Sequence, residues 1–172
     1  MMPNSNRIQL TSFISPVGKL VLGDYNGKLC LCDWTDRKQP DKVFNRLQKG
    51  LKASYQDART ALHDETIEQL HAYFSRTLTQ FTLPLLPIGT DFQQAIWAQL
   101  HTINYGTTQS YQDIANTLNK PKSVRAVANA IGANALSLLV PCHRVVGSNG
   151  AITGYAGGVP AKTYLLALEA ND

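Results

Sequence analysis

The segment LPLLPIG, which begins at Leu83, constrains the fold of this chain more than any other stretch of its sequence. Pro84 and Pro87 exclude a helix here, because proline lacks a backbone donor and clashes with the preceding helical turn. Short runs of alternating apolar and polar residues precede the segment, and helical spacing follows it. The change predicts an N-terminal domain of residues 1–82, an extended linker of residues 83–90 and a C-terminal domain of residues 91–172.

The N-terminal domain is expected to be an α/β domain with a small antiparallel sheet. Alternating residues form three short runs, and Asn26-Gly27 between the last two is a strong hairpin signal. Two stretches with helical spacing of apolar residues come next. The predicted strands cover residues 8–13, 19–22 and 28–34, and the predicted helices cover residues 41–55 and 64–76.

The C-terminal domain is expected to be mostly helical. Thr90 caps a first helix, and Ser110 with Asp113 three residues later forms a variant of the capping box. A break at Asn119–Pro121 separates this second, short helix from a third over residues 122–133. Two short helices joined by a tight break outline a helix-turn-helix. The predicted fold class is therefore α+β, with a winged-helix domain in the second half.

The charge pattern suits a polyanionic partner. The net charge is +4, and residues 114–168 hold no acidic side chain at all. The cations of that interval are Lys120, Lys122, Arg125, Arg144 and Lys162. A basic stretch without counter-charge favours DNA as the partner. The cations are not dense, so chance accounts for the pattern equally well.

Composition excludes several classes. Apolar residues make up 44% and charged residues 16%, which is typical of a globular protein rather than a disordered one. No apolar run is long enough to cross a bilayer, and the N-terminus lacks the pattern of a signal peptide. We therefore expect a cytoplasmic monomer without membrane contact. Cys30 and Cys32 should share one face of a strand as core thiols, and no residue set has metal-ligand spacing.

The predicted helix of residues 122–133 has an unusually low surface. Alanine and glycine occupy many of its positions, and Arg125 is its one large charged projection. Small side chains allow a close approach, either to another helix inside the domain or to a DNA groove. The second reading is favoured by Arg125, because burying a cation without an acid is costly.

The run from Leu138 to Gly147 is the most informative stretch. An apolar, strand-like run delivers Cys142 directly after Pro141, and His143 follows. A basic neighbourhood with a histidine would lower the pKa of a thiol and make it a better nucleophile. Adjacent residues on an extended chain point to opposite sides, so the pair needs a bend or a bridging water. A buried structural thiol remains an open alternative on these residues alone.

The segment PCHRV, residues 141–145, resembles the active-site signature of the O6-alkylguanine-DNA alkyltransferases. Further segments resemble motifs of the same family, in the same order. These are SYQDIA at Ser110, PKSVRAV at Pro121, Asn134, GYAGG at Gly154 and LLALE at Leu165. The resemblance covers the whole second half of the chain and, more weakly, the first.

The resemblance implies a role for each site residue. Cys142 would attack the alkyl carbon on guanine O6, and on O4 of alkylthymine as well. His143 would withdraw the thiol proton through a water, with Glu169 orienting it. Tyr111, otherwise read as a packed helical tyrosine, would donate to the leaving guanine, and Asn134, otherwise a helix C-cap, would hold the hinge beside the active-site strand. The product is a thioether, so each molecule would act once and need no cofactor.

The resemblance also implies how DNA is held. The alkylated base must leave the stack, and Arg125 would fill the gap from the minor groove. The implied DNA-binding residues are Arg125, Lys122, Ala126, Ala130 and Tyr111. The implied base pocket consists of Val145, Tyr155, Ala156, Gly157 and Gly158. The expected partner is double-stranded DNA that contains O6-alkylguanine.

Two departures from the family pattern bear on substrate size. Ser137 stands where some relatives carry proline, and Ala156 where some carry serine. Three other functions compete with alkyl transfer. A damage-binding alkyltransferase-like protein would lack Cys142, a winged-helix regulator would not need His143 and Glu169, and a cysteine hydrolase would turn over small esters or amides.

Overall fold

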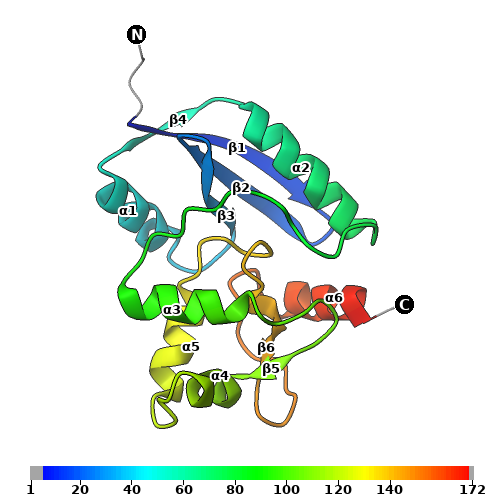
Figure 1. Ribbon diagram of the computed structural model, residues 1–172. Coiled ribbons are helices and arrows are strands. Elements are labelled where there is room, and N and C mark those ends of the chain that lie inside the picture. The colour runs from blue at the N-terminus through cyan, green and yellow to red at the C-terminus, as the bar shows by residue number, and fades with distance from the viewer. Residues whose placement is uncertain (1–5, 171–172) are drawn as a thin grey trace.

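The computed structural model describes residues 6–170. The expectation that the chain has no signal peptide concerns its first residues, most of which lie outside this range. Its first half contains a four-stranded sheet in the order β3-β2-β1-β4 (Figure 1). The strands are β1 (Arg7–Ser15), β2 (Gly18–Tyr25), β3 (Lys28–Trp34) and β4 (Ser54–Asp57). The first three are antiparallel, as predicted, and β4, which was not predicted, runs parallel to β1, so the sheet is mixed.

The strand β4 was missed because the helix before it is shorter than predicted. Helix α1 (Pro40–Leu51) ends where Lys52 adopts a left-handed backbone with φ 50°. The next residues then pair with β1, so the predicted helix of residues 41–55 is wrong over its last turn. Helix α2 (Ala61–Phe74) confirms the second predicted helix with its start three residues earlier, at a capping box formed by Thr60 and His63.

Cys30 and Cys32 do not share one face of β3. The register between β2 and β3 shifts at Gly23 and Asp24, which pair with Leu31 and Leu29 and leave Cys30 as an extra residue. Such a β-bulge interrupts the alternation of side chains. Cys30 consequently packs in the cluster around Leu31 and α1, while Cys32 packs in the main core. Both thiols are fully buried, as a core role requires.

The second half is mostly helical, as predicted. Its elements are α3 (Asp91–Leu100), β5 (Gln109–Ser110), α4 (Tyr111–Thr117), α5 (Val124–Gly132), the short 3₁₀ helix η1 (Cys142–Arg144), β6 (Val145–Val146) and α6 (Val159–Ala170). The caps at Thr90 and Ser110 are confirmed, each with reciprocal side-chain hydrogen bonds. Helices α4 and α5 pack together as the two helices of a helix-turn-helix. Strands β5 and β6 form a short parallel pair beside them.

The two halves share one core. Sheet residues such as Leu22 and Trp34 belong to the same buried cluster as Trp97 of α3 and Leu165 of α6. Residues of the predicted linker are extended and pair with the sheet, since Leu29 donates to the carbonyl of Pro84 at 2.9 Å and accepts from Leu86 at 2.8 Å. Among residues 6–170, no helix combines the length and the apolar character that crossing a bilayer requires.

Candidate active site

Cys142 is the first residue of η1 and lies at the bottom of a cavity. The residues before it do not form the predicted strand. Leu138 has a left-handed backbone with φ 72°, and the amide of Cys142 donates to the carbonyl of Val140 at 2.7 Å. Pro141 caps the 3₁₀ helix. The chain therefore bends at the cysteine, which is one of the two alternatives by which Cys142 and His143 could act together.

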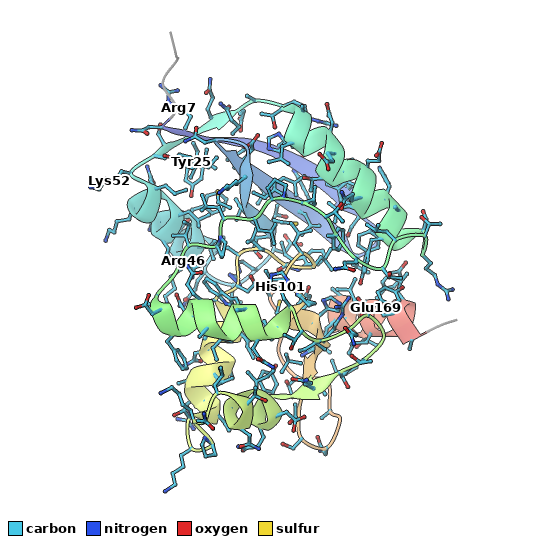
Figure 2. The ribbon with its side chains drawn as sticks, in the orientation of Figure 1. Arg7, Tyr25, Arg46, Lys52, His101 and Glu169 are labelled. Atoms are coloured by element: carbon cyan, nitrogen blue, oxygen red, sulfur yellow. The ribbon has the colours of Figure 1, made fainter. Side chains whose placement is uncertain are left out.

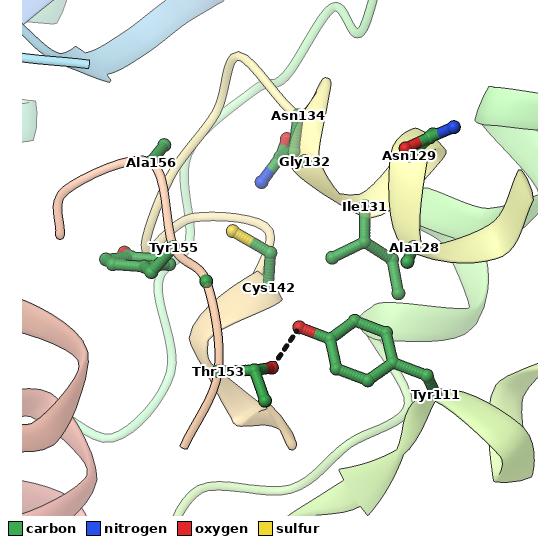
Figure 3. A pocket seen from close by; sticks show the side chains of 11 residues that line it. Tyr111, Ala128, Asn129, Ile131, Gly132, Asn134, Cys142, Thr153, Tyr155 and Ala156 are labelled. Atoms are coloured by element: carbon green, nitrogen blue, oxygen red, sulfur yellow. Dashed lines mark hydrogen bonds between the residues drawn. The ribbon is translucent and has the colours of Figure 1, made fainter. Parts of the chain in front are cut away.

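The cavity has a volume of about 340 Å³, and residues of α5 form part of its lining. Figure 3 shows the sulfur of Cys142 pointing into it, between Asn134 and Tyr155. The lining residues are Tyr111, Ala128, Asn129, Ile131, Gly132, Asn134, Cys142, Thr153, Gly154, Tyr155 and Ala156. Of the predicted pocket residues, Tyr155 and Ala156 line the cavity, whereas Val145 is fully buried in the core and Gly157 and Gly158 are not among the lining residues.

The surroundings of the Cys142 thiol raise its pKa, contrary to the expectation of a lowered value. Only 5% of the residue is exposed, and desolvation of a thiolate outweighs the opposing effects. A hydrogen bond with Asn134 and the positive charge of Lys162 favour the thiolate but do not overcome burial. In this structure the resting form is therefore the thiol, so a nucleophilic role requires a base to remove its proton.

Asn134 connects the end of α5 to the segment that carries the cysteine. Its amide nitrogen donates to the carbonyl of Val140 at 3.0 Å, and its amide oxygen accepts from the backbone of Leu136 at 3.0 Å. Both bonds are buried, so they fix the loop between α5 and η1. The side chain thus lies between α5 and the cysteine segment, where the family resemblance implies a hinge.

His143 is fully buried, and its Nε2 lies 2.7 Å from Oε2 of Glu169. Burial lowers the pKa of His143, although the hydrogen bond and the charge of Glu169 act in the opposite direction. An ionised carboxylate only accepts hydrogen bonds, so Nε2 must carry the proton. In the neutral ring Nδ1 is then an acceptor, and it has no hydrogen-bond partner among the described residues. The residue that follows Cys142 in the chain therefore offers a free acceptor nitrogen.

Arg144 and Tyr73 complete the surroundings of Glu169. Arg144 belongs to the PCHRV segment but was given no role there, and nothing in the sequence indicated Tyr73. Arg144 binds the carboxylate with two nitrogens, Nε at 2.8 Å and Nη2 at 3.1 Å. The Tyr73 hydroxyl, from α2 in the first half, donates to Oε2 at 2.6 Å. Burial alone would raise the pKa of Glu169, but these donors and His143 hold it well below the ordinary value. Glu169 is therefore a stable anion.

The loop between β6 and α6 forms one wall of the cavity. The hydroxyl of Thr153 donates to that of Tyr111 at 3.2 Å (Figure 3). The indole nitrogen of Trp34, on β3, donates to the hydroxyl of Tyr155 at 3.2 Å. A Cβ on Gly157 would come within 2.8 Å of that indole, so the backbone can approach it only as glycine. Trp34 and Thr153 are further site residues that no local motif marks.

Lys162 of α6 is a buried cation behind the same loop. Its Nζ lies 3.4 Å from the carbonyl of Gly154 and 5.7 Å from the centre of the Tyr111 ring. Burial lowers the pKa of Lys162, and the charge of a Cys142 thiolate would raise it. An ammonium at this place favours negative charge on the sulfur.

The predicted DNA-facing residues fall into two groups. Lys122, Arg125 and Ala126 are exposed at the start of α5, and the structure shows no ion pair of Arg125 within residues 6–170. Ala130 is buried, and its carbonyl accepts the indole N–H of Trp97 at 2.9 Å. Its side chain faces the core because it lies on the face of α5 that packs against α3, so this prediction requires correction.

Two arginines of the first half hold the end of α5. Arg37 donates to the carbonyl of Gly132 and Arg46 to that of Ala133, each at 2.7 Å. Arg46 projects from α1 toward α3, where its guanidinium lies over the ring of Trp97 (Figure 2). Cations at a helix C-terminus satisfy its free carbonyls and oppose its dipole. The described residues contain no cluster of three or more metal-ligating side chains.

Comparisons with known proteins agree on one family. Residues 91–171 match the family described as 6-O-methylguanine DNA methyltransferase, DNA binding domain. A methylated-DNA–protein-cysteine methyltransferase of Methanosarcina acetivorans is 46% identical over 163 residues, which cover 92% of this chain and 96% of the relative. The protein of the same name from Mycobacterium leprae is 38% identical over 166 residues, which cover 96% and 94%.

Solved structures show the same likeness over both halves. The crystal structure of Mycobacterium tuberculosis OGT in complex with DNA superposes with a TM-score of 0.81 at 36% identity. The alignment covers 95% of this chain and 93% of that one.

Proposed function

The chain belongs to the methylated-DNA–protein-cysteine methyltransferase family, and from this premise we propose that its reaction takes place at Cys142. The protein binds DNA and repairs O6-methylguanine by transferring the alkyl group to a cysteine of its own. The observation that supports Cys142 is its buried thiol at the floor of a cavity, next to a histidine with a free acceptor nitrogen. Cys30 and Cys32, by contrast, are core residues that do not line the cavity.

The chemistry is a direct displacement. The sulfur of Cys142 attacks the alkyl carbon, the bond between that carbon and O6 breaks, and its electron pair stays on guanine. Nδ1 of His143 accepts the thiol proton through a bridging water, while Nε2–H stays bonded to Glu169. The product is a thioether, which water does not cleave readily. Each molecule therefore acts once.

Tyr111 assists the departure of guanine. Its hydroxyl lines the cavity and accepts the hydrogen bond of Thr153, so its own hydrogen remains to be donated. Donation to a ring nitrogen of the base would neutralise the charge that develops there. Asn134 holds the cysteine segment, and Tyr155 and Ala156 bound the pocket for the base.

The partner is double-stranded DNA with the alkylated nucleotide rotated out of the stack. Rotation costs roughly a few kcal/mol, and Arg125 offsets it by filling the vacated place. The exposed, alanine-rich start of α5 supports this role, because it lets the helix approach the minor groove. Lys122, just before the helix, contacts the phosphate backbone.

The proposal is tested by the mass of the intact protein before and after incubation with duplex DNA containing O6-methylguanine. We expect one added methyl group per molecule, located on Cys142 by peptide mapping. Cys142→Ala should abolish transfer and still bind the duplex, whereas the matched variant Cys30→Ala should transfer normally. A label on Cys30 or Cys32, or continued turnover, would contradict the assignment.

A further inference from the structure

Tyr73 reaches the proton-accepting network from the other half of the chain. It lies in the last turn of α2, 96 residues before Glu169 in sequence, and is 1% exposed. Its hydroxyl donates to Oε2 of Glu169 at 2.6 Å, the same oxygen that accepts from His143 at 2.7 Å. Tyr73 and His143 therefore donate to the same oxygen atom, which also accepts from Nη2 of Arg144 at 3.1 Å.

The rest of the carboxylate is already fully engaged. Arg144 donates to both oxygens and gives its remaining nitrogen to the carbonyl of Ile103 at 2.7 Å. The backbone of Gly106 lies 3.4 Å from Oε1. The charges of Glu169 and Arg144 balance, so a protonated His143 would add an uncompensated buried charge. The arrangement favours the neutral ring that a base requires.

Other charged and titratable groups surround His143. Lys162 of α6 and Arg144 of η1 both disfavour a second positive charge on the ring. The ring of Tyr155 packs at 6.5 Å from that of His143. On the far side of the carboxylate, the ring of Tyr105 lies 6.3 Å from that of Tyr73 and beneath the Arg144 guanidinium, with Arg76 nearby. Of the side chains around His143, Tyr73 is the uncharged one that donates to Oε2 of Glu169.

We propose that Tyr73 is a positioning residue of the alkyl transfer: its hydroxyl draws electron density from Glu169 Oε2 and so keeps His143 neutral and correctly oriented toward Cys142. This proposal rests on His143 being the base. Through Glu169 it connects the N-terminal half of the chain to the proton transfer.

Removal of the hydroxyl should act through the protonation of His143. In Tyr73→Phe the carboxylate loses one donor and holds the Nε2 proton more strongly, which favours the imidazolium. The pKa of His143 then rises, and the ring loses its base function at a higher pH than in the unchanged protein. We expect alkyl transfer to be roughly tenfold slower at acidic pH, the effect of one hydrogen bond to a charged group. The difference should shrink as the pH rises.

The experiment is a pH profile of single-turnover alkylation with free O6-benzylguanine, from about pH 5.5 to about pH 9, which spans the ordinary pKa values of histidine and cysteine. The free base removes DNA binding from the measurement. Tyr105→Phe is the matched control, because Tyr105 packs against the same arginine and its hydroxyl forms no hydrogen bond with Glu169 in the described residues. Imidazole ¹⁵N shifts of His143 report its protonation independently of the rate.

The outcomes separate this proposal from the proposed function. An acid limb displaced to higher pH in Tyr73→Phe but not in Tyr105→Phe supports the role. A loss by the same factor at every pH, with unchanged His143 titration, means that Tyr73 only stabilises the fold and overturns it. A Tyr73→Phe profile identical to that of the unchanged protein overturns it as well. If the unchanged protein alkylates no cysteine, the proposed function itself fails.

Discussion

Glu169 has two tasks at the scale of single residues. Its carboxylate is the counter-charge of the buried Arg144 and the hydrogen-bond acceptor of His143. Any substitution of Glu169 therefore disturbs the fold and the chemistry together. The PCHRV segment contains Arg144, but Glu169 lies 25 residues further along the chain, so the segment alone does not indicate that the two residues form an ion pair.

Glu169→Gln should slow alkyl transfer much more than it weakens DNA binding, and should also destabilise the protein. Removing one partner of a buried ion pair costs about 3 kcal/mol, because the other charge stays buried. The pKa of Glu169 is depressed in the folded state, so its contribution to stability is present above the ordinary carboxyl pKa and is lost as the pH falls. Urea unfolding should therefore give a lower free energy of unfolding for Glu169→Gln than for the unchanged protein, and this difference should become smaller at acidic pH.

A double variant separates the two tasks. Arg144→Met combined with Glu169→Gln removes both charges and should recover most of the lost stability. Its alkylation rate should stay low, since His143 still lacks its carboxylate. If the rate recovered along with the stability, Glu169 would be a structural residue only.

At the scale of elements, the sequence was most informative where the signal is local. Caps fixed the starts of α3 and α4, and the break at Pro121 separated α4 from α5. The end of α1 was mispredicted because it depends on Lys52 adopting a left-handed backbone and on pairing with β1, far away in the chain. The bulge at Cys30 likewise arises between strands and leaves no mark in one strand's pattern.

The residues of the site likewise include some that a local motif identifies and others that only the tertiary structure reveals. Cys142, His143 and Asn134 are brought together by one short stretch, and a family motif identifies it. Trp34 and Tyr73 reach the site across 121 and 96 residues, respectively, and their own neighbourhoods look like ordinary strand and helix. Only tertiary packing reveals them.

Arg125 on helix α5 has two possible roles, filling the gap left by the rotated base or contacting a phosphate, and an experiment can distinguish them. Arg125→Ala should slow repair of a duplex lesion markedly, because without the arginine the stacked position of the nucleotide is again favoured over the rotated-out position. It should slow reaction with free O6-benzylguanine much less, since no rotation is needed. The measurement is the rate of Cys142 alkylation on both substrates. Equal slowing on both would mean that Arg125 merely supports the fold.

Lys122→Ala is the matched control for that experiment. Lys122 is exposed like Arg125 but precedes the helix. Loss of a phosphate contact should weaken binding to all duplexes and reduce the slope of log affinity against log salt by about one. The rate on free base should not change.

At the scale of the whole molecule, the two halves depend on each other. The main core contains residues of the sheet, of α3 and of α6 in one cluster. Arg37 and Arg46 satisfy carbonyls at the end of α5. The proposed division at residues 83–90 thus marks a change of architecture, although buried side chains of both halves form one cluster across it.

This shared core predicts a single unfolding transition for the whole chain. Trp34 lies in the first half and Trp97 in the second, and both are buried in the same cluster. The Trp97→Phe variant reports the fluorescence of Trp34, and the Trp34→Phe variant reports that of Trp97. Both signals should change at the same urea concentration after correction for each variant's stability. Two separate midpoints within one variant, by fluorescence and by circular dichroism, would show that the halves unfold independently.

The outer edge of β3 illustrates a further consequence. Leu29 is paired with the segment around Pro84 and Leu86, and Cys32 exchanges backbone hydrogen bonds with Ala135 and Ser137. An unpaired strand edge is a template on which other chains can add. Here the connection between the halves and the segment beside the cysteine occupy that template. The connection between the halves and the segment beside the cysteine therefore prevent another chain from pairing with this edge of the sheet at those positions.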